Sequence, residues 1–145
     1  HPIFLYRNAL ETRRQLERTQ DVIAEVTGVR PQMARPPCGV RTPAYFRAAR
    51  ELGLRTVQWT IAGFDWKKRE AERIAHDVVR NATAGSIILL HDGDSAGKRD
   101  RSATVAAIPI IIAGLQSRGL RVAPLTQLLQ VEKSQIHLSP ETTYD

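Results

Sequence analysis

Cysteine is almost absent from this sequence: Cys38 stands alone, so the chain forms no internal disulfide. No apolar run approaches the ~20 residues that a membrane-spanning helix needs, and the first residues do not read as a signal peptide. The sequence also lacks internal repeats and domain linkers. Its 145 residues, 42% of them hydrophobic, therefore predict one globular domain with a sizeable core.

Acidic residues are outnumbered, and the formal net charge is +6. Basic proteins often bind nucleic acid, anionic cell-wall polymers or membrane surfaces. Here the arginines are spread along predicted helices and form no dense block with interleaved aromatic residues. This pattern favours solvated helix faces, with a basic nucleic-acid-binding α/β domain as an alternative. Binding that falls steeply with added salt and ignores sugars would favour that alternative.

Apolar spacing and end signals predict helices and strands in alternation. Asn8 and Thr42 are helix-capping residue types, and Gly28 is a stop signal. We expect helices over 8–26, 42–53, 70–81, 102–118 and 124–129, and strands over 32–35, 54–60, 87–90 and 120–123. The segment 61–66 is expected to be a loop. Alternation at this spacing predicts an α/β fold with a parallel sheet.

Apolar stripes are predicted on two of these helices. The stripe of the first consists of Leu10, Leu16, Ile23 and Val26, and that of the helix over 102–118 consists of Val105, Ile108, Ile112 and Leu115.

Polar groups follow three successive predicted strands, at the point where each ends. They are Arg35, with Pro36-Pro37-Cys38-Gly39 after it, then Asp65-Trp66, and then His91-Asp92. Parallel strands lie about 4.8 Å apart, and ligands gather beyond their carboxyl ends. A carboxylate beside a histidine adjusts the acidity of the imidazole, so that the histidine can serve as a general acid. The flat apolar face of an indole ring can pack against a sugar ring. The matched placement favours a functional site over unrelated surface residues.

In this order and spacing, the segments Arg35–Gly39, Asp65-Trp66 and Leu89–Asp92 resemble the last three motifs of the polysaccharide deacetylases, carbohydrate esterase family 4. The similarity spans about residues 1–129. It implies an incomplete irregular (β/α) barrel whose first strands are missing. Residues 1–131 would form the C-terminal two-thirds of a deacetylase domain, and 132–145 a polar tail.

The resemblance implies metal-dependent removal of acetyl groups from N-acetylated, or O-acetylated, sugars of a polysaccharide. In that family a divalent metal, usually zinc, polarises the carbonyl and activates a water. By position, His91 would be the general acid, Asp65 its tuning partner, and Arg35 the residue that orients the base.

Four further positions would contact substrate by the same resemblance. Trp66 and Leu89 would line the groove, and the backbone N–H that follows Pro37, that of Cys38, would help to hold the oxyanion. The family usually has tyrosine where this sequence has Cys38. This replacement leaves the backbone N–H donor in place, whereas the surface that a tyrosine side chain would offer to the substrate is lost.

The family's first motif, a strand ending in Asp-Asp, is not found in the sequence. His1-Pro2 fits the closing histidine of the second motif, which makes His1 the candidate metal ligand. Because one ligand of three cannot hold zinc tightly, we expect the chain as given to be a truncated and inactive portion of an enzyme. The alternative is a relative that binds glycans without hydrolysing them. The resemblance alone favours the cell envelope or secretion.

Overall fold

A computed structural model of the chain describes residues 8–93 and 97–129. The chain divides into two compact units, His1–Gln58 and Trp59–Asp145. The candidate metal ligand His1 and the tail predicted over 132–145 lie outside the described residues.

The first unit begins with α1 (Ala9–Thr27), which has the end signals that the sequence predicts. The Asn8 side chain accepts a hydrogen bond from the Glu11 N–H at 3.0 Å, and Gly28 ends the helix with φ of 72°. In α2 (Pro43–Glu51) the Thr42 side chain accepts from the Tyr45 N–H at 3.1 Å. Both predicted helix starts are therefore confirmed.

Between and after these helices lie two short parallel strands, β1 (Met33–Ala34) and β2 (Arg55–Thr56), with Met33 opposite Arg55. The core of this unit consists of Tyr45, Ala49 and Leu54, against which Leu16, Ala34 and Leu52 pack.

The stripe predicted on α1 is largely wrong. Leu10 and Val26 are exposed, whereas Thr12 and Gln20 are buried. Each of these two side chains donates to a backbone carbonyl, Thr12 to that of Asn8 and Gln20 to that of Pro31, which satisfies their donor groups.

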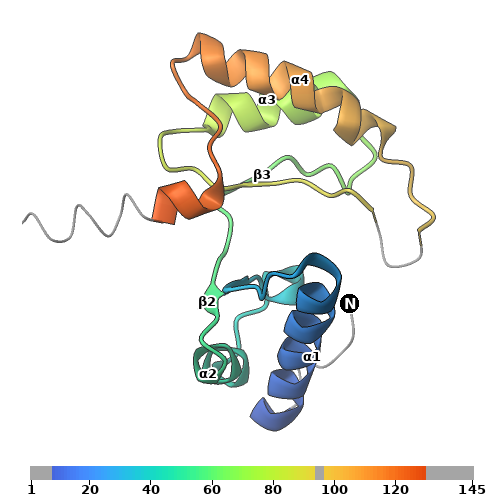
Figure 1. Ribbon diagram of the computed structural model, residues 1–145. Coiled ribbons are helices and arrows are strands. Elements are labelled where there is room, and N and C mark those ends of the chain that lie inside the picture. Colours follow the sequence, from blue (N-terminus) through green and yellow to red (C-terminus); the bar gives the residue numbers. More distant parts are fainter. Residues whose placement is uncertain (1–7, 94–96, 130–145) are drawn as a thin grey trace, which may run out of the picture. The chain divides into compact units, whose positions relative to one another are not determined.

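The second unit contains β3 (Ile61–Ala62), α3 (Ala71–Asn81), β4 (Ile88–Leu89) and α4 (Ser102–Ser117). Figure 1 shows α3 and α4 side by side, with the strand pair on the α3 side. Strand β3 corrects the prediction of a loop over 61–66, because Ile61 and Ala62 pair in parallel with Ile88 and Leu89.

The strand predicted over 120–123 does not form. Leu120 donates its N–H to the Leu115 carbonyl at 2.9 Å, which closes the end of α4 instead of joining a sheet. Residues 125–129 are helical, as predicted.

The α3–α4 packing forms the main core, with Ile74 and Val78 from α3 and Ala107, Ile111 and Leu115 from α4. The predicted inward face of α4 is correct only at Leu115, since Val105, Ile108 and Ile112 are exposed and Thr104, Ala107 and Ile111 are buried. Apolar residues occur on every side of α4, so hydropathy alone does not mark the face that packs.

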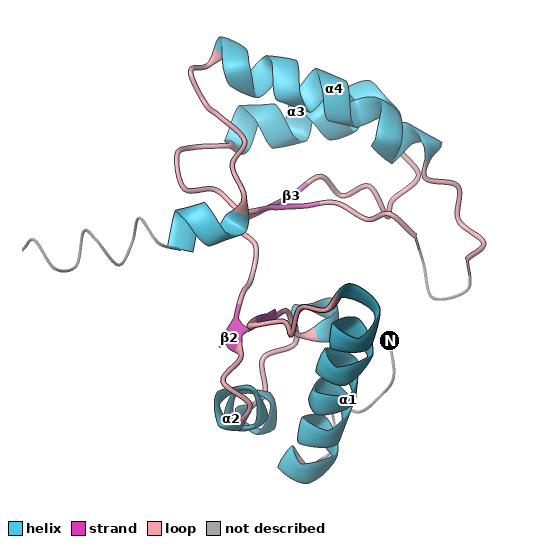
Figure 2. Cartoon of the chain, in the orientation of Figure 1, coloured by secondary structure: helices cyan, strands magenta, loops and turns pink. Residues whose placement is uncertain are grey.

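The α/β class with parallel strands is confirmed. The described residues form two separate parallel pairs, β1–β2 and β3–β4, and within them no barrel closes. Figure 2 shows how short the strands are between the helices and loops. Within the described part of the chain, no helix has both the length and the apolar character needed to cross a membrane.

Candidate active site

Asp65 is the buried centre of the candidate site, with a side chain that is 0% exposed. Its Oδ1 lies 2.9 Å from Nδ1 of His91, and its Oδ2 accepts the His91 backbone N–H at 2.7 Å. The Thr104 hydroxyl donates to the same Oδ2 at 3.1 Å. A buried carboxylate needs such donors because it has left water, and here both of its oxygens have at least one.

The backbone between β3 and Asp65 is tightly constrained. A Cβ on Gly63 would lie 2.6 Å from Cδ2 of Leu90 and 3.1 Å from Cγ2 of Ile74, so only glycine fits without displacing the core. Phe64 follows with φ of 52°, a left-handed conformation that costs a bulky residue energy. This kink follows the strand directly and leads into the buried Asp65.

Opposing effects act on the pKa of Asp65. Burial of the carboxyl raises the pKa, whereas the hydrogen bonds from the His91 ring and N–H, the charge of His91 and the Thr104 hydroxyl lower it. The lowering effects prevail, and the pKa lies below its ordinary value near 3.8. Asp65 is therefore an anion at neutral pH.

His91 is fixed on one side and reachable on the other. With Nδ1 bound to Asp65, Nε2 is the ring nitrogen that can transfer a proton, and the side chain is 36% exposed. The Trp66 ring lies edge-on to the imidazole, with centroids 5.3 Å apart. Leu89 is half-buried on β4, between Ile88 and Leu90, which pack on the helical core. Because side chains alternate along a strand, Leu89 lies on the opposite face.

The start of α4 positions this site, a role that the sequence analysis missed. Besides Thr104, Arg101 donates to the backbone carbonyls of Asp65 and Gly93, at 3.1 and 3.0 Å. Arg99 donates to the Trp66 carbonyl at 3.1 Å. One feature of the sequence could have indicated this role: Thr104 is a polar residue on the same face of the helix as the buried Ala107, Ile111 and Leu115.

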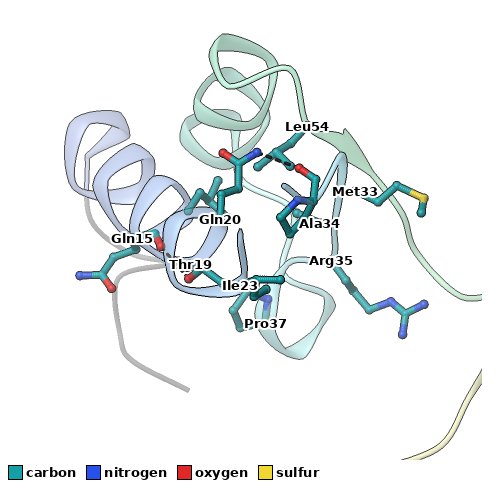
Figure 3. A pocket seen from close by; sticks show the side chains of 11 residues that line it. Gln15, Thr19, Gln20, Ile23, Met33, Ala34, Arg35, Pro37 and Leu54 are labelled. Carbon is teal, nitrogen blue, oxygen red and sulfur yellow. Dashed lines mark hydrogen bonds between the residues drawn. The ribbon is translucent and has the colours of Figure 1, made fainter. Parts of the chain in front are cut away.

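Three predicted site residues, Arg35, Pro37 and Cys38, lie in the first unit, directly after β1. Arg35 and Pro37 border a pocket of about 320 Å³ between α1 and β1. Figure 3 shows the guanidinium of Arg35 extending away from Thr19 and Gln20 on α1. The exposed Cys38 has φ of 53°, and the turn is closed by a Gly39 N–H to Pro36 carbonyl bond of 2.9 Å.

The left-handed conformation of Cys38 gives a testable expectation. Cys38→Asn should stabilise the chain by about 0.5–1 kcal/mol, because asparagine tolerates this conformation better than other side chains. Urea denaturation measures the change. Cys38→Ala is the matched control. It removes the thiol but is no better suited to the left-handed conformation, so it should not raise the free energy of unfolding. Equal stability of the two variants would contradict the expectation.

Comparison with known proteins places these residues in a family. A family model described as polysaccharide deacetylase matches residues 1–57. A peptidoglycan-N-acetylglucosamine deacetylase of Bacillus cereus is 40% identical over 102 residues, which cover 69% of this chain and 46% of that protein. The chain belongs to the polysaccharide deacetylase family, carbohydrate esterase family 4.

Solved structures of family 4 proteins share the fold over part of their length. A peptidoglycan N-acetylglucosamine deacetylase matches with a TM-score of 0.81 and 31% identity, over 90% of this chain and 59% of its own. A family 4 pseudoenzyme from Bacillus anthracis matches with a TM-score of 0.76 and 27% identity, over 86% of this chain and 41% of its own. The chain spans about half the length of the curated relatives it matches first.

The described residues do not fit the metal that the family implies. Among residues 8–93 and 97–129, no three His, Cys, Asp or Glu side chains come together as a metal site. His91 directs Nδ1 at Asp65, and His76 on α3 lies beside Asp77. His1, the candidate ligand, is outside the described residues.

Proposed function

We propose that this chain is part of a hydrolase that removes acetyl groups from N-acetylated sugars of a polysaccharide. Family membership supports the reaction class, and the share of each relative that the chain covers supports its being a portion of a deacetylase domain, residues 1–131 by our expectation. The observation that carries the proposal is the buried Asp65 bound to the half-exposed His91.

In this proposal His91 is the general acid. Hydrolysis of an acetamide adds water to the carbonyl and breaks the C–N bond, so the departing nitrogen needs a proton. Asp65 fixes the imidazole with Nδ1 inward, and the Nε2–H supplies that proton to the leaving amine. Trp66, edge-on to the ring, and Leu89 would form the apolar wall along the sugar.

The remaining predicted residues would assist the attack of water and stabilise the oxyanion in the whole protein. Arg35 would orient the base, and the turn at Pro37 and Cys38 would present a backbone N–H to the oxyanion. A divalent metal such as zinc would be held by His1 together with residues outside this sequence. Since the described residues do not hold it, we expect the 145-residue chain alone to release no acetate.

The test is acetate release from a chitin oligosaccharide by the protein encoded by the uninterrupted reading frame. We expect zinc-dependent release, and we expect His91→Gln to lower kcat by about 100-fold or more, because the departing amine loses its acid. Zinc content, measured by elemental analysis, should stay unchanged.

His76→Gln is the matched control, because His76 is an exposed histidine on α3 beside a different aspartate. It should retain full activity. Loss of zinc in His91→Gln would make His91 a ligand and not the acid. The family's second motif has the pattern His-Ser/Thr-x-x-His, so with His1 as its closing histidine the first histidine would lie four residues before His1. The proposal also fails if the reading frame encodes no histidine there and no Asp-Asp farther upstream.

A relative that binds glycans without cleaving them is the second candidate function. Its support is the similarity to a family 4 pseudoenzyme, together with the lack of a metal cluster among residues 8–93 and 97–129. Saturable binding of an acetylated glycan by the protein from the complete reading frame, with no acetate release at any zinc concentration, would favour it.

A further inference from the structure

The hydroxyl of Thr104 forms its hydrogen bond outside its own helix. In α1, the hydroxyls of Thr12, Thr19 and Thr27 each donate to the carbonyl four residues earlier, which is the common bond of a helical threonine. Thr104, in the first turn of α4, donates instead to Oδ2 of Asp65, at 3.1 Å and across 39 residues of sequence. The residue is only 5% exposed, so this bond forms away from water. Its partner is the carboxylate at the centre of the site.

The other two bonds of the Asp65 carboxylate both go to one residue. Nδ1 of His91 lies 2.9 Å from Oδ1, and the His91 backbone N–H donates to Oδ2 at 2.7 Å. These bonds fix the carboxylate relative to His91, but both residues lie outside the regular elements, after the short strands β3 and β4. Thr104 adds a bond from a helix whose later turns place Ala107 and Ile111 in the core. It is therefore the bond that ties the pair to the helical core.

Arg101 holds the backbone on both sides of the same pair. It directly precedes α4 and donates to the carbonyl of Asp65 at 3.1 Å and to that of Gly93 at 3.0 Å. The guanidinium thereby joins the segment that follows β3 to the segment that follows β4. Because Arg101 bonds the backbone, what the Thr104 hydroxyl restricts is the rotation of the Asp65 side chain.

We propose that Thr104 is a positioning residue of the general acid, which holds the Asp65 carboxylate at the rotation that fixes the His91 ring. The inference rests on the proposed function, in which His91 gives its Nε2 proton to the leaving amine. Proton transfer needs the donor nitrogen within about 2.6–3.2 Å of the accepting atom, so a small tilt of the ring takes Nε2 out of reach. Thr104 bonds Asp65 and acts through it.

The experiment measures acetate release from a chitin oligosaccharide by the protein encoded by the uninterrupted reading frame. Thr104→Val keeps the shape of the side chain and removes the hydroxyl. We expect it to lower kcat about tenfold, because the acid is misplaced, and to leave KM within about twofold. Thr104→Ser keeps the hydroxyl and should restore kcat to within about twofold of the unmodified protein. The assay is run at a temperature at which circular dichroism shows every variant to be folded.

Thr12→Val is the matched control, because Thr12 is a buried helical threonine that donates to its own helix. It removes a buried hydroxyl of the same kind without touching Asp65. We expect its kcat to stay within about twofold of the unmodified value.

A double variant separates positioning of the acid from a general loss of structure. Residues that act as one unit have non-additive effects. In protein that already carries His91→Gln, Thr104→Val should therefore lower kcat no further, because the acid that it positions is gone. A general loss of structure would instead multiply with the effect of His91→Gln.

The imidazole itself gives a reading that needs no activity. With isotope-labelled histidine in the 145-residue chain, we expect Thr104→Val to shift the nuclear magnetic resonances of the His91 ring nitrogens. Thr104→Ser and Thr12→Val should leave them in place. The chain has four histidines, and the signals that disappear in His91→Gln identify those of His91.

The proposal is overturned if Thr104→Val retains kcat, if Thr104→Ser loses as much as Thr104→Val, or if the loss multiplies with that of His91→Gln. It is also overturned if the His91 resonances do not move in Thr104→Val. A protein from the complete reading frame that releases no acetate contradicts the proposed function instead, and the resonances of His91 then decide the role of Thr104.

Discussion

Asp65→Asn is expected to destabilise the chain by about 3 kcal/mol at neutral pH. The carboxylate accepts three hydrogen bonds while its side chain is fully buried, and bonds to a charged acceptor are the stronger kind. An amide in its place points an NH₂ group at one of those donors, which leaves buried polar groups unsatisfied. Urea denaturation followed by circular dichroism measures the loss.

The loss of stability in Asp65→Asn should become smaller at acidic pH. The pKa of Asp65 in the folded chain lies below its ordinary value near 3.8, so its ionised form is stabilised by folding. That stabilisation is complete above about pH 4 and is lost as the pH falls through the lower, folded pKa. The difference between the unmodified chain and Asp65→Asn should therefore shrink as the pH falls below about 4, and its charge-dependent part disappears below the folded pKa of Asp65, where both chains carry a neutral side chain.

Asp92→Asn is the control for this prediction, since Asp92 is the exposed neighbour of His91. It should change the free energy of unfolding by less than about 0.5 kcal/mol. A loss in Asp65→Asn that stays constant from pH 3 to pH 7 would show that shape, and not charge, is responsible.

Gly114→Val is expected to cost about 2–3 kcal/mol of folding free energy. A Cβ at Gly114 would lie 2.7 Å from Cγ2 and 3.0 Å from Cγ1 of Val79 on α3. A β-branched side chain in a helix has essentially one rotamer, so Val79 cannot turn aside and the two helices must separate. Thermal or urea denaturation measures the effect.

Ala113→Val is the matched control, because Ala113 is the exposed neighbour of Gly114 on the same helix. It introduces the same side chain without a facing neighbour and should stay within about 0.5 kcal/mol of the unmodified chain. Combining Val79→Ala with Gly114→Val should recover part of the loss. If the free-energy costs of Val79→Ala and Gly114→Val simply add in the double variant, the contact between these two positions does not cause the loss of stability.

Local signals made the helix starts predictable from the sequence. Asn8 and Thr42 accept from the backbone three residues later, an interaction that depends only on neighbours along the chain. The meeting of Asp65 and His91 was expected from their places after successive predicted strands, although the strand that precedes Asp65 is β3 and not the one predicted over 54–60. Their roles in catalysis stay predictions.

Tertiary packing decided what the sequence analysis missed. Hydropathy ranks Thr104 and Gln20 as surface residues, but each is buried on a partner that lies far along the chain, Asp65 or the Pro31 carbonyl. In α4, with apolar residues on every side, contacts with α3, such as that of Val79 at Gly114, determine which face packs, and hydropathy does not. Strand β3 depends on β4, which lies more than 20 residues away in the sequence.

The distance in sequence between Asp65 and Thr104 sets an order of events during synthesis. Thr104 leaves the ribosome 39 residues after Asp65, which is roughly 2–8 s at 5–20 residues per second. For that interval the carboxylate lacks the hydrogen bond that the α4 hydroxyl donates to it. The newly made chain therefore completes this pair of polar groups only when α4 has emerged and docked on α3.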